Sequence, residues 1–247
     1  MKKQYVEICV GSIDSCLIAQ KAGADRVELC DNLLEGGTTP SYSTIVYAKE
    51  HLSLDTMVMI RPRGGDFLYN DIEFQLMKED ILVCKKIGVK GVVLGLLNTD
   101  GSIDKQRTKE LIKLSQPLDV CFHRAVDMTS DYIKAVEDII DCGAKRILTS
   151  GARNKAIEGM DNIKKIQNIY GDRIEIMVGS GVNSNNISML KKETNVSNFH
   201  LSAKHSIDSD MTFRHPIVSM GGTNINEYSK TIANYDEIKK VVQLVKN

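Results

Sequence analysis

The chain has 247 residues, 42% of them hydrophobic and 26% charged, and its 32 Lys and Arg side chains balance 32 Asp and Glu side chains. This composition is typical of a globular protein with a sizeable core. With zero net charge, the chain has no excess of positive charge to neutralise phosphates, so we do not expect a nucleic acid partner. It also lacks the roughly 18 consecutive apolar residues of a membrane span, so we do not expect a membrane partner. Glu7 interrupts the apolar region that a signal peptide would need, so we expect a cytoplasmic protein with reduced cysteines.

Short apolar segments predict β-strands along the whole chain. They are Tyr5–Val10, Arg26–Cys30, Thr56–Arg61, Gly91–Leu96, Asp119–His123, Arg146–Thr149, Glu175–Val178 and Asn198–Ser202. Amphipathic stretches lie between them, such as Ile72–Ile87 and Asp131–Cys142, whose apolar residues recur at helical spacing. Eight strands that alternate with helices predict an α/β fold: a single (β/α)₈ TIM-like barrel domain over residues 1–247.

Several residues mark where the predicted helices begin and end. Ser41 is expected to cap the helix after the second strand. Left-handed helix ends are predicted at Gly23, Gly88, Gly143 and Asn195. An irregular segment, 206–229, is expected near the barrel mouth, followed by a closing helix over Tyr235–Val245.

The alternation of strand side chains predicts which residues point into the barrel. In the first strand, Val6, Ile8 and Val10 are expected to face the helices, which turns Glu7 and Cys9 inward. The same reasoning gives an inward set of Glu7, Cys9, Glu28, Cys30, Arg61, Arg63, His123, His200 and Ser202. Most lie near the C-terminal ends of strands, where active sites of such barrels occur. The alternative is a structural ion-pair network, since buried charges require partners.

Two chemistries fit the inward set, and the first is the binding of a small anion. The residues assigned to that site are Arg61, Arg63, Asp66, Arg124, Asp127, His200 and Ser202. The turns Thr149–Gly151 and Gly179–Val182 offer further backbone N–H groups. In an enzyme built this way, Glu7 or Glu28 would be a general base and His123 an acid or base.

The second chemistry is metal binding. Cys9 and Cys30 lie on adjacent predicted strands and point inward at similar heights. Soft thiolates suit Cu(I). The alternative is that both are small, buried and inert, as cysteines often are.

Several motifs resemble those of the CutC family, whose members are named as copper-homeostasis proteins. The matching segments are Glu7-Ile8-Cys9-Val10, Gly23-Ala24-Asp25-Arg26-Val27-Glu28-Leu29-Cys30, Glu35-Gly36-Gly37-Thr38-Thr39-Pro40-Ser41, Ile60-Arg61-Pro62-Arg63-Gly64-Gly65-Asp66-Phe67, Phe122-His123-Arg124-Ala125, Leu148-Thr149-Ser150-Gly151 and His200-Leu201-Ser202-Ala203. The resemblance spans nearly the whole chain. It implies a TIM-like barrel, a cytoplasmic location, a homo-oligomer (dimer or tetramer) and a role in copper handling, with Cu(I) bound through Cys9 and Cys30. The arginines in the same motifs favour an anion instead, and the sequence leaves both hypotheses open.

Overall fold

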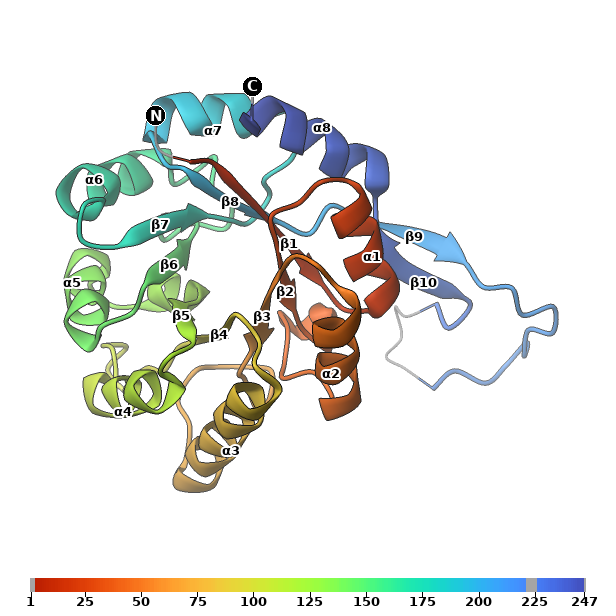
Figure 1. The fold of residues 1–247 in the computed structure, drawn as a ribbon, viewed down its shortest axis with the longest axis horizontal. Helices are drawn as coiled ribbons and strands as arrows, with labels where there is room; N and C mark the ends of the chain where they lie inside the picture. Colours follow the sequence, from red (N-terminus) through yellow and green to blue (C-terminus); the bar gives the residue numbers. More distant parts are fainter. Residues whose placement is uncertain (1–2, 221–225, 247) are drawn as a thin grey trace.

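The strands follow one another around a closed barrel in the order of the sequence. A computed structural model describes residues 3–220 and 226–246. Its barrel strands are β1 (Tyr5–Val10), β2 (Arg26–Leu29), β3 (Asp55–Met59), β4 (Gly91–Leu94), β5 (Asp119–Phe122), β6 (Arg146–Thr149), β7 (Glu175–Val178) and β8 (Asn198–Leu201). The pairs are parallel, and β1 closes the ring by pairing with both β2 and β8. The predicted (β/α)₈ barrel is confirmed (Figure 1).

The helices form a layer around the outside of the barrel (Figure 1). They are α1 (Ile13–Lys21), α2 (Tyr42–His51), α3 (Asp71–Ile87), α4 (Lys105–Ser115), α5 (Tyr132–Cys142), α6 (Met160–Tyr170), α7 (Ile187–Thr194) and α8 (Tyr235–Lys246), with short 3₁₀ helices η1 (Leu33–Glu35) and η2 (Arg124–Met128). Ser41 caps α2 by accepting a hydrogen bond from the Thr44 N–H, as predicted. Positive φ angles are found at the predicted helix ends Gly23, Gly88, Gly143 and Asn195.

Side chains on the two faces of the sheet form two separate apolar clusters. The outer cluster packs the sheet against the helices and contains the predicted outward residues of the first strands, including Val6, Ile8 and Val10. The inner cluster fills the barrel and consists of Cys30, Met57, Met59, Val93, Cys121, Leu148 and Met177, with Cys9 and Leu33 against it. The alternation of these strands therefore predicted correctly which side chains enter the barrel.

Several strands end earlier than the sequence pattern indicated. For example, β3 ends at Met59 and β5 at Phe122, before Arg61 and His123 respectively. Beyond β3, the Arg61 N–H donates to Thr39 Oγ1. Beyond β5, the His123 N–H still donates to the Leu94 carbonyl of β4, and the His123 side chain caps η2. Arg61 and His123 thus stand in the loops at the C-terminal mouth of the barrel.

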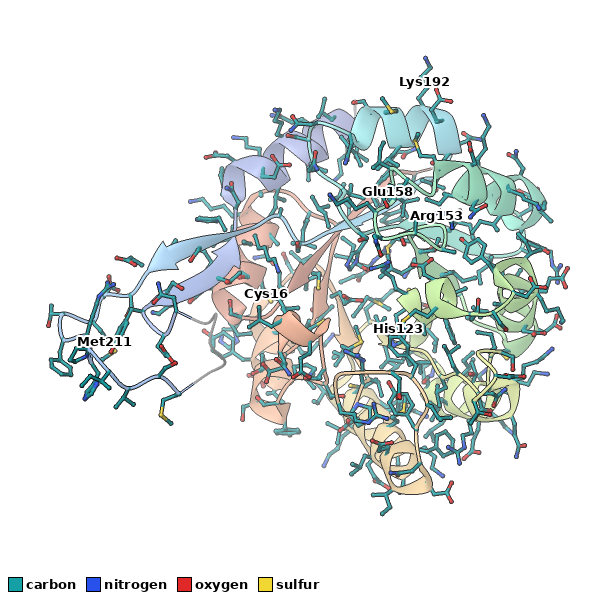
Figure 2. All side chains as sticks on the ribbon, turned by 180° about the vertical axis from the view of Figure 1, so that it is seen from behind. Cys16, His123, Arg153, Glu158, Lys192 and Met211 are labelled. Carbon is teal, nitrogen blue, oxygen red and sulfur yellow. The ribbon has the colours of Figure 1, made fainter. Side chains whose placement is uncertain are left out.

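The described residues of the predicted irregular segment 206–229 are irregular between 209 and 228, and a strand borders the segment at each end. Strands β9 (Lys204–Asp208) and β10 (Ser229–Ala233) pair antiparallel as a two-stranded ribbon, and residues 221–225 of the predicted segment lie outside the described residues. We call residues 204–220 and 226–233 the arm. It extends sideways from the barrel beside α1 instead of folding over the mouth (Figure 1). In Figure 2, Met211 marks its far end and His123 lies within the barrel.

Candidate metal and ligand site at the barrel mouth

Three neighbouring strands bring the acidic, imidazole and thiol groups of the inward set together. In the pairing of β1 with β8, Glu7 lies opposite His200, and in the pairing of β1 with β2, Cys9 lies opposite Glu28. Strand closure thus places residues from both ends of the chain on one side of the barrel interior. The four side chains form one continuous polar cluster.

Glu7 is the ionised carboxylate of this cluster. Its Oε2 accepts a hydrogen bond of 2.7 Å from Arg26 Nε, and its Oε1 lies 2.9 Å from His200 Nδ1. Burial by itself would raise the pKa of Glu7, but the charge of Arg26 and the contact with His200 outweigh it and lower the pKa to about 2. Arg26 was not among the predicted site residues, although it shares the strand phase of Glu28 and Cys30 and could have been found by that signal.

Glu28 is the second carboxyl group, and its surroundings favour the protonated form. Burial and the nearby Cys9 thiolate raise the pKa of Glu28 well above its usual value. Its Oε2 lies 3.7 Å from His200 Nε2 and 3.6 Å from Cys30 Sγ. Burial disfavours the charged form of His200, yet the Cys9 thiolate and the Glu7 carboxylate beside it raise its pKa well above the usual value. His200 is therefore an imidazolium beside the Glu7 carboxylate.

Cys9 and Cys30 form a close, reduced pair. Their Sγ atoms are 3.9 Å apart, and both residues are free cysteines. The hydrogen bond from the Cys30 thiol is the largest cause that lowers the pKa of Cys9 well below its usual value, and His200 adds to it. The same bond, with burial, raises the pKa of Cys30. The pair thus holds one thiolate and one thiol.

This cluster has donor atoms suited to a metal ion. Among the described residues, two groups have ligand atoms within 4.8 Å of one another: Cys9, Glu28 and Cys30, and Glu7, Glu28 and His200. A metal–sulfur bond is roughly 2.3 Å long in zinc thiolates, so one first-row ion between the two sulfurs could contact both. The donor set therefore fits a soft ion such as Cu(I) at the thiols.

The cluster opens into a pocket of about 340 Å³ at the mouth. It is lined by Cys9, Glu28, Glu35, Gly36, Met59, Arg61, Gly65, Phe67, His123, Arg124, Met128, Leu148 and His200. A second pocket of about 250 Å³ adjoins it and includes Ser202. Seven predicted site residues line these two pockets: Cys9, Glu28, Arg61, His123, Arg124, His200 and Ser202. Glu7 and Cys30 are buried and do not line them.

His123 is a neutral imidazole in the wall of this pocket. Burial, assisted by the charge of Arg61, lowers the pKa of His123 to about 3. Its Nδ1 accepts a hydrogen bond from the Ala125 N–H, which places the ring proton on Nε2. Gly95 makes room for this ring, because a Cβ there would come within 2.5 Å of it.

Arg61 mainly holds the loops of the mouth together. Its guanidinium donates to the backbone carbonyls of Glu35, Gly37 and Gly65 at 2.7, 2.9 and 2.8 Å. Arg63 is turned away from the pocket and pairs with Asp66 and Glu73. The structure therefore does not place Arg63 and Asp66 in the predicted anion site, and the two arginines do not form a clamp.

Asp127 occupies the anion position predicted at the turn after the sixth strand. Its carboxylate accepts hydrogen bonds from the Thr149 and Ser150 hydroxyls and from the backbone N–H groups of Ser150 and Ala152. Arg124 Nε also donates to it, at 2.9 Å. The turn Thr149–Gly151 thus binds an anion supplied by the chain itself, and Asp127 does not line the pocket. The turn Gly179–Val182 differs, since its residues 180–182 line the second pocket.

A larger cavity lies at the other end of the barrel. It measures about 870 Å³ and is lined by residues that precede the strands, among them Lys3, Asp25 and Ser197. The N-terminal face of such barrels serves stability more than chemistry. The polar cluster and its two pockets at the C-terminal mouth are therefore the candidate site.

A closed parallel barrel surrounded by helices, with buried carboxyl, imidazole and thiol groups at its C-terminal mouth, defines a TIM-barrel protein with its candidate site at that mouth. Residues 4–205 match the CutC family. The chain belongs to the CutC family, as the resemblance of its motifs had indicated.

Related proteins of this family match along nearly the whole chain. A CutC family protein of Bacteroides thetaiotaomicron is 46% identical and covers 100% of both chains. The copper homeostasis protein cutC homolog of Homo sapiens is 40% identical over 98% of this chain and 89% of its own. The crystal structure of the CutC protein from Streptococcus agalactiae has a TM-score of 0.77 and 39% identity over 81% of this chain and 98% of that one.

More distant structures share the fold alone. Phosphoribosyl anthranilate isomerase from Thermotoga maritima has a TM-score of 0.58 and 13% identity, with 98% of each chain covered. In the described part of the chain, no helix is long and apolar enough to span a membrane.

Proposed function

We propose that this protein serves copper homeostasis in the cytoplasm by binding Cu(I) through Cys9 and Cys30. The observation that carries the proposal is the pair of sulfurs 3.9 Å apart, of which Cys9 lines an open pocket and Cys30 is buried beside it. Copper homeostasis is also what the names of several relatives state. A soft, monovalent ion prefers thiolate ligands, and a reducing compartment keeps the thiols free to bind it.

The charges around the sulfurs support this assignment. Binding Cu(I) to both sulfurs would release the Cys30 proton and leave two thiolates around one positive ion, a net charge of −1. The His200 imidazolium lies beside Cys9 and contributes to lowering its pKa, so it can compensate that charge. Arg61 and Arg124 repel a cation less than the sequence indicated. Backbone carbonyl groups accept hydrogen bonds from Arg61, and Asp127 pairs with Arg124.

Anaerobic titration of Cu(I) against a chromophoric chelator tests this proposal. We expect the reduced protein to bind one Cu(I) with thiolate-to-copper absorption in the ultraviolet. A Cys9→Ser/Cys30→Ser variant should bind roughly 100-fold more weakly, since the loss of two thiolate ligands is expected to cost at least about 2.7 kcal/mol.

A Cys142→Ala variant is the matched control, because that cysteine is buried at the end of α5, outside the mouth. Its Cu(I) affinity should equal that of the wild type. Equal affinity of the wild type and the double serine variant would refute the two-thiolate site.

The second hypothesis, catalysis on a small anion with an arginine clamp, receives less support. The family members are named for copper homeostasis, and Arg63 lies outside the pocket.

A homo-oligomer, implied by the resemblance, is part of our proposal, with the arm as the contact between copies. Apolar side chains of Phe213, Ile217 and Met220 are exposed on the arm by 67%, 87% and 88%.

A further inference from the structure

The two pockets at the mouth adjoin each other. Both are lined by Cys9, Gly36, Arg124 and His200. The larger one, of about 340 Å³, extends from these residues towards the loops after β3 and β5. The smaller one, of about 250 Å³, extends towards the loops after β7 and β8. A single ligand could therefore reach both pockets by passing Cys9 and His200, which line both.

The smaller pocket has the character of an anion site. Arg124 and Lys204 line it, and its lining contains no Asp or Glu among the described residues. Because Arg124 is already paired with Asp127 outside the pocket, Lys204 supplies the unpaired positive charge. Within the same described part of the chain, the Lys204 ammonium and the Ser202 hydroxyl make no hydrogen bond or ion pair. Ser180 and Gly181 have φ angles of 76° and 70° in the wall, a backbone shape that can present N–H groups to an anion.

The larger pocket contains buried polar atoms that lack partners. Glu28 Oε1, Arg61 Nε and His123 Nε2 make no hydrogen bond with any described residue. All three residues line this pocket and are 2–4% exposed. Unpaired buried polar atoms are rare in folded proteins, and a ligand that pairs with them gains the free energy that their isolation costs.

The remaining wall of the larger pocket is apolar. Met59, Phe67, Met128 and Leu148 line it together with the polar groups, and the Phe67 ring packs against Arg61 and His123. Small-molecule sites combine such walls with a few placed polar groups, in volumes from roughly 300 Å³ upward. An inorganic ion would leave this wall and the unpaired atoms without contacts, whereas the body of an organic molecule would fill them.

We propose that the two pockets together bind one small organic anion. Its carboxylate or phosphate lies in the smaller pocket against Arg124, Lys204 and Ser202. Its body, which carries a hydroxyl or carbonyl oxygen, fills the larger pocket and accepts a hydrogen bond from the His123 Nε2–H. This binding does not depend on copper, so its test uses the copper-free, reduced protein.

Calorimetric titration with four probes tests the proposal: malate, glycerol 3-phosphate, inorganic phosphate and glycerol. We expect malate or glycerol 3-phosphate to bind at least 10-fold more tightly than inorganic phosphate, and glycerol not to bind. Whichever of the two organic anions binds more tightly identifies the charged group as carboxylate or phosphate. Absence of binding by both at 10 mM, or binding no tighter than that of inorganic phosphate, would overturn the proposal.

Two variants then locate the ligand. Lys204→Met should weaken binding of the organic anion roughly 10-fold, while Lys240→Met, an exposed lysine on α8, should leave it unchanged. His123→Phe should weaken the organic anion but leave inorganic phosphate unaffected, with circular dichroism confirming that the variant is folded. Organic-anion affinity that is unchanged in both Lys204→Met and His123→Phe would place the ligand elsewhere.

Discussion

Glu7 and Glu28 are the same residue type on adjacent strands, yet their neighbours give them different charge states. Glu7 contacts Arg26 and His200, which keep it ionised. Glu28 is buried and lies beside the Cys9 thiolate, and both its burial and this charge raise its pKa. One carboxyl group therefore maintains the ion pairs of the barrel interior, and the other is a neutral acid that faces the pocket.

This difference predicts unequal effects of two identical substitutions at pH 7. Glu7→Gln should lower the free energy of unfolding by about 3–5 kcal/mol, because it leaves Arg26 buried without its charge partner. Glu28→Gln should cost less than about 1 kcal/mol, since a neutral amide replaces a neutral acid of similar shape. Urea unfolding of both variants measures the two values, and equal losses would contradict the assigned charge states.

We expect the free energy of unfolding to depend on pH through His123. Its pKa of about 3 in the folded protein lies below the usual 6.5, so the neutral ring contributes stability above pH 6.5 that is lost as the pH falls towards 3. From pH 7 to pH 5 this loss is about 2 kcal/mol for one such histidine. In a His123→Gln variant, the drop in unfolding free energy between these pH values should be smaller by that amount. An unchanged drop would show that His123 titrates normally.

The alternation of strand residues predicted the inward cluster but failed beyond the strand ends. Glu7, Cys9, Glu28 and His200 lie within strands, where side chains alternate strictly, and all four belong to the one polar cluster. Arg63 lies four residues after β3 ends at Met59, so no strand pairing fixes the direction of its side chain. The unpaired atoms and the charge states could not be predicted, because they depend on contacts between strands that are distant in sequence.

At the scale of elements, Asp127 connects η2 to the turn after β6. Asp127→Ala would remove its hydrogen bonds to residues 149, 150 and 152 and leave backbone N–H groups unpaired. We expect a loss of roughly 2–4 kcal/mol in the free energy of unfolding. The same substitution at Asp66, an exposed partner of Arg63, should cost less than about 1 kcal/mol. Chemical denaturation compares the two, and similar costs would show that Asp127 does not hold this turn.

The helices were predicted well because their signals are local. Apolar spacing located α3 and α5 to within one residue, and Gly88 and Gly143 end them with positive φ angles. The ribbon of β9 and β10 carried no such signal, since every residue of β9 is exposed and no apolar alternation marks it. The two strands of the ribbon pair because the chain runs out and back along the arm, and the periodicity of the sequence does not reveal such a reversal.

For the whole molecule, the arm predicts self-association. Light scattering with size-exclusion chromatography should give a multiple of the 27.5 kDa chain mass, two- or fourfold. A Phe213→Glu/Ile217→Glu variant should shift the protein towards the monomer, because charges replace exposed apolar contacts. A Leu76→Glu variant on α3, also exposed, is the control and should keep the wild-type mass. A wild-type monomer at micromolar concentration would contradict the prediction.

The closure of the barrel between β1 and β8 also orders events during synthesis. Cys9, on β1, and Cys30, directly after β2, leave the ribosome early, whereas His200 is 193 residues beyond Glu7. Domains fold as units during translation, so a nascent chain carries both thiols long before their charged imidazole neighbour exists. The reactivity of the thiol pair therefore depends on completion of the polypeptide. An unfinished or truncated chain exposes cysteines whose pKa values are not shifted by the neighbours present in the finished barrel.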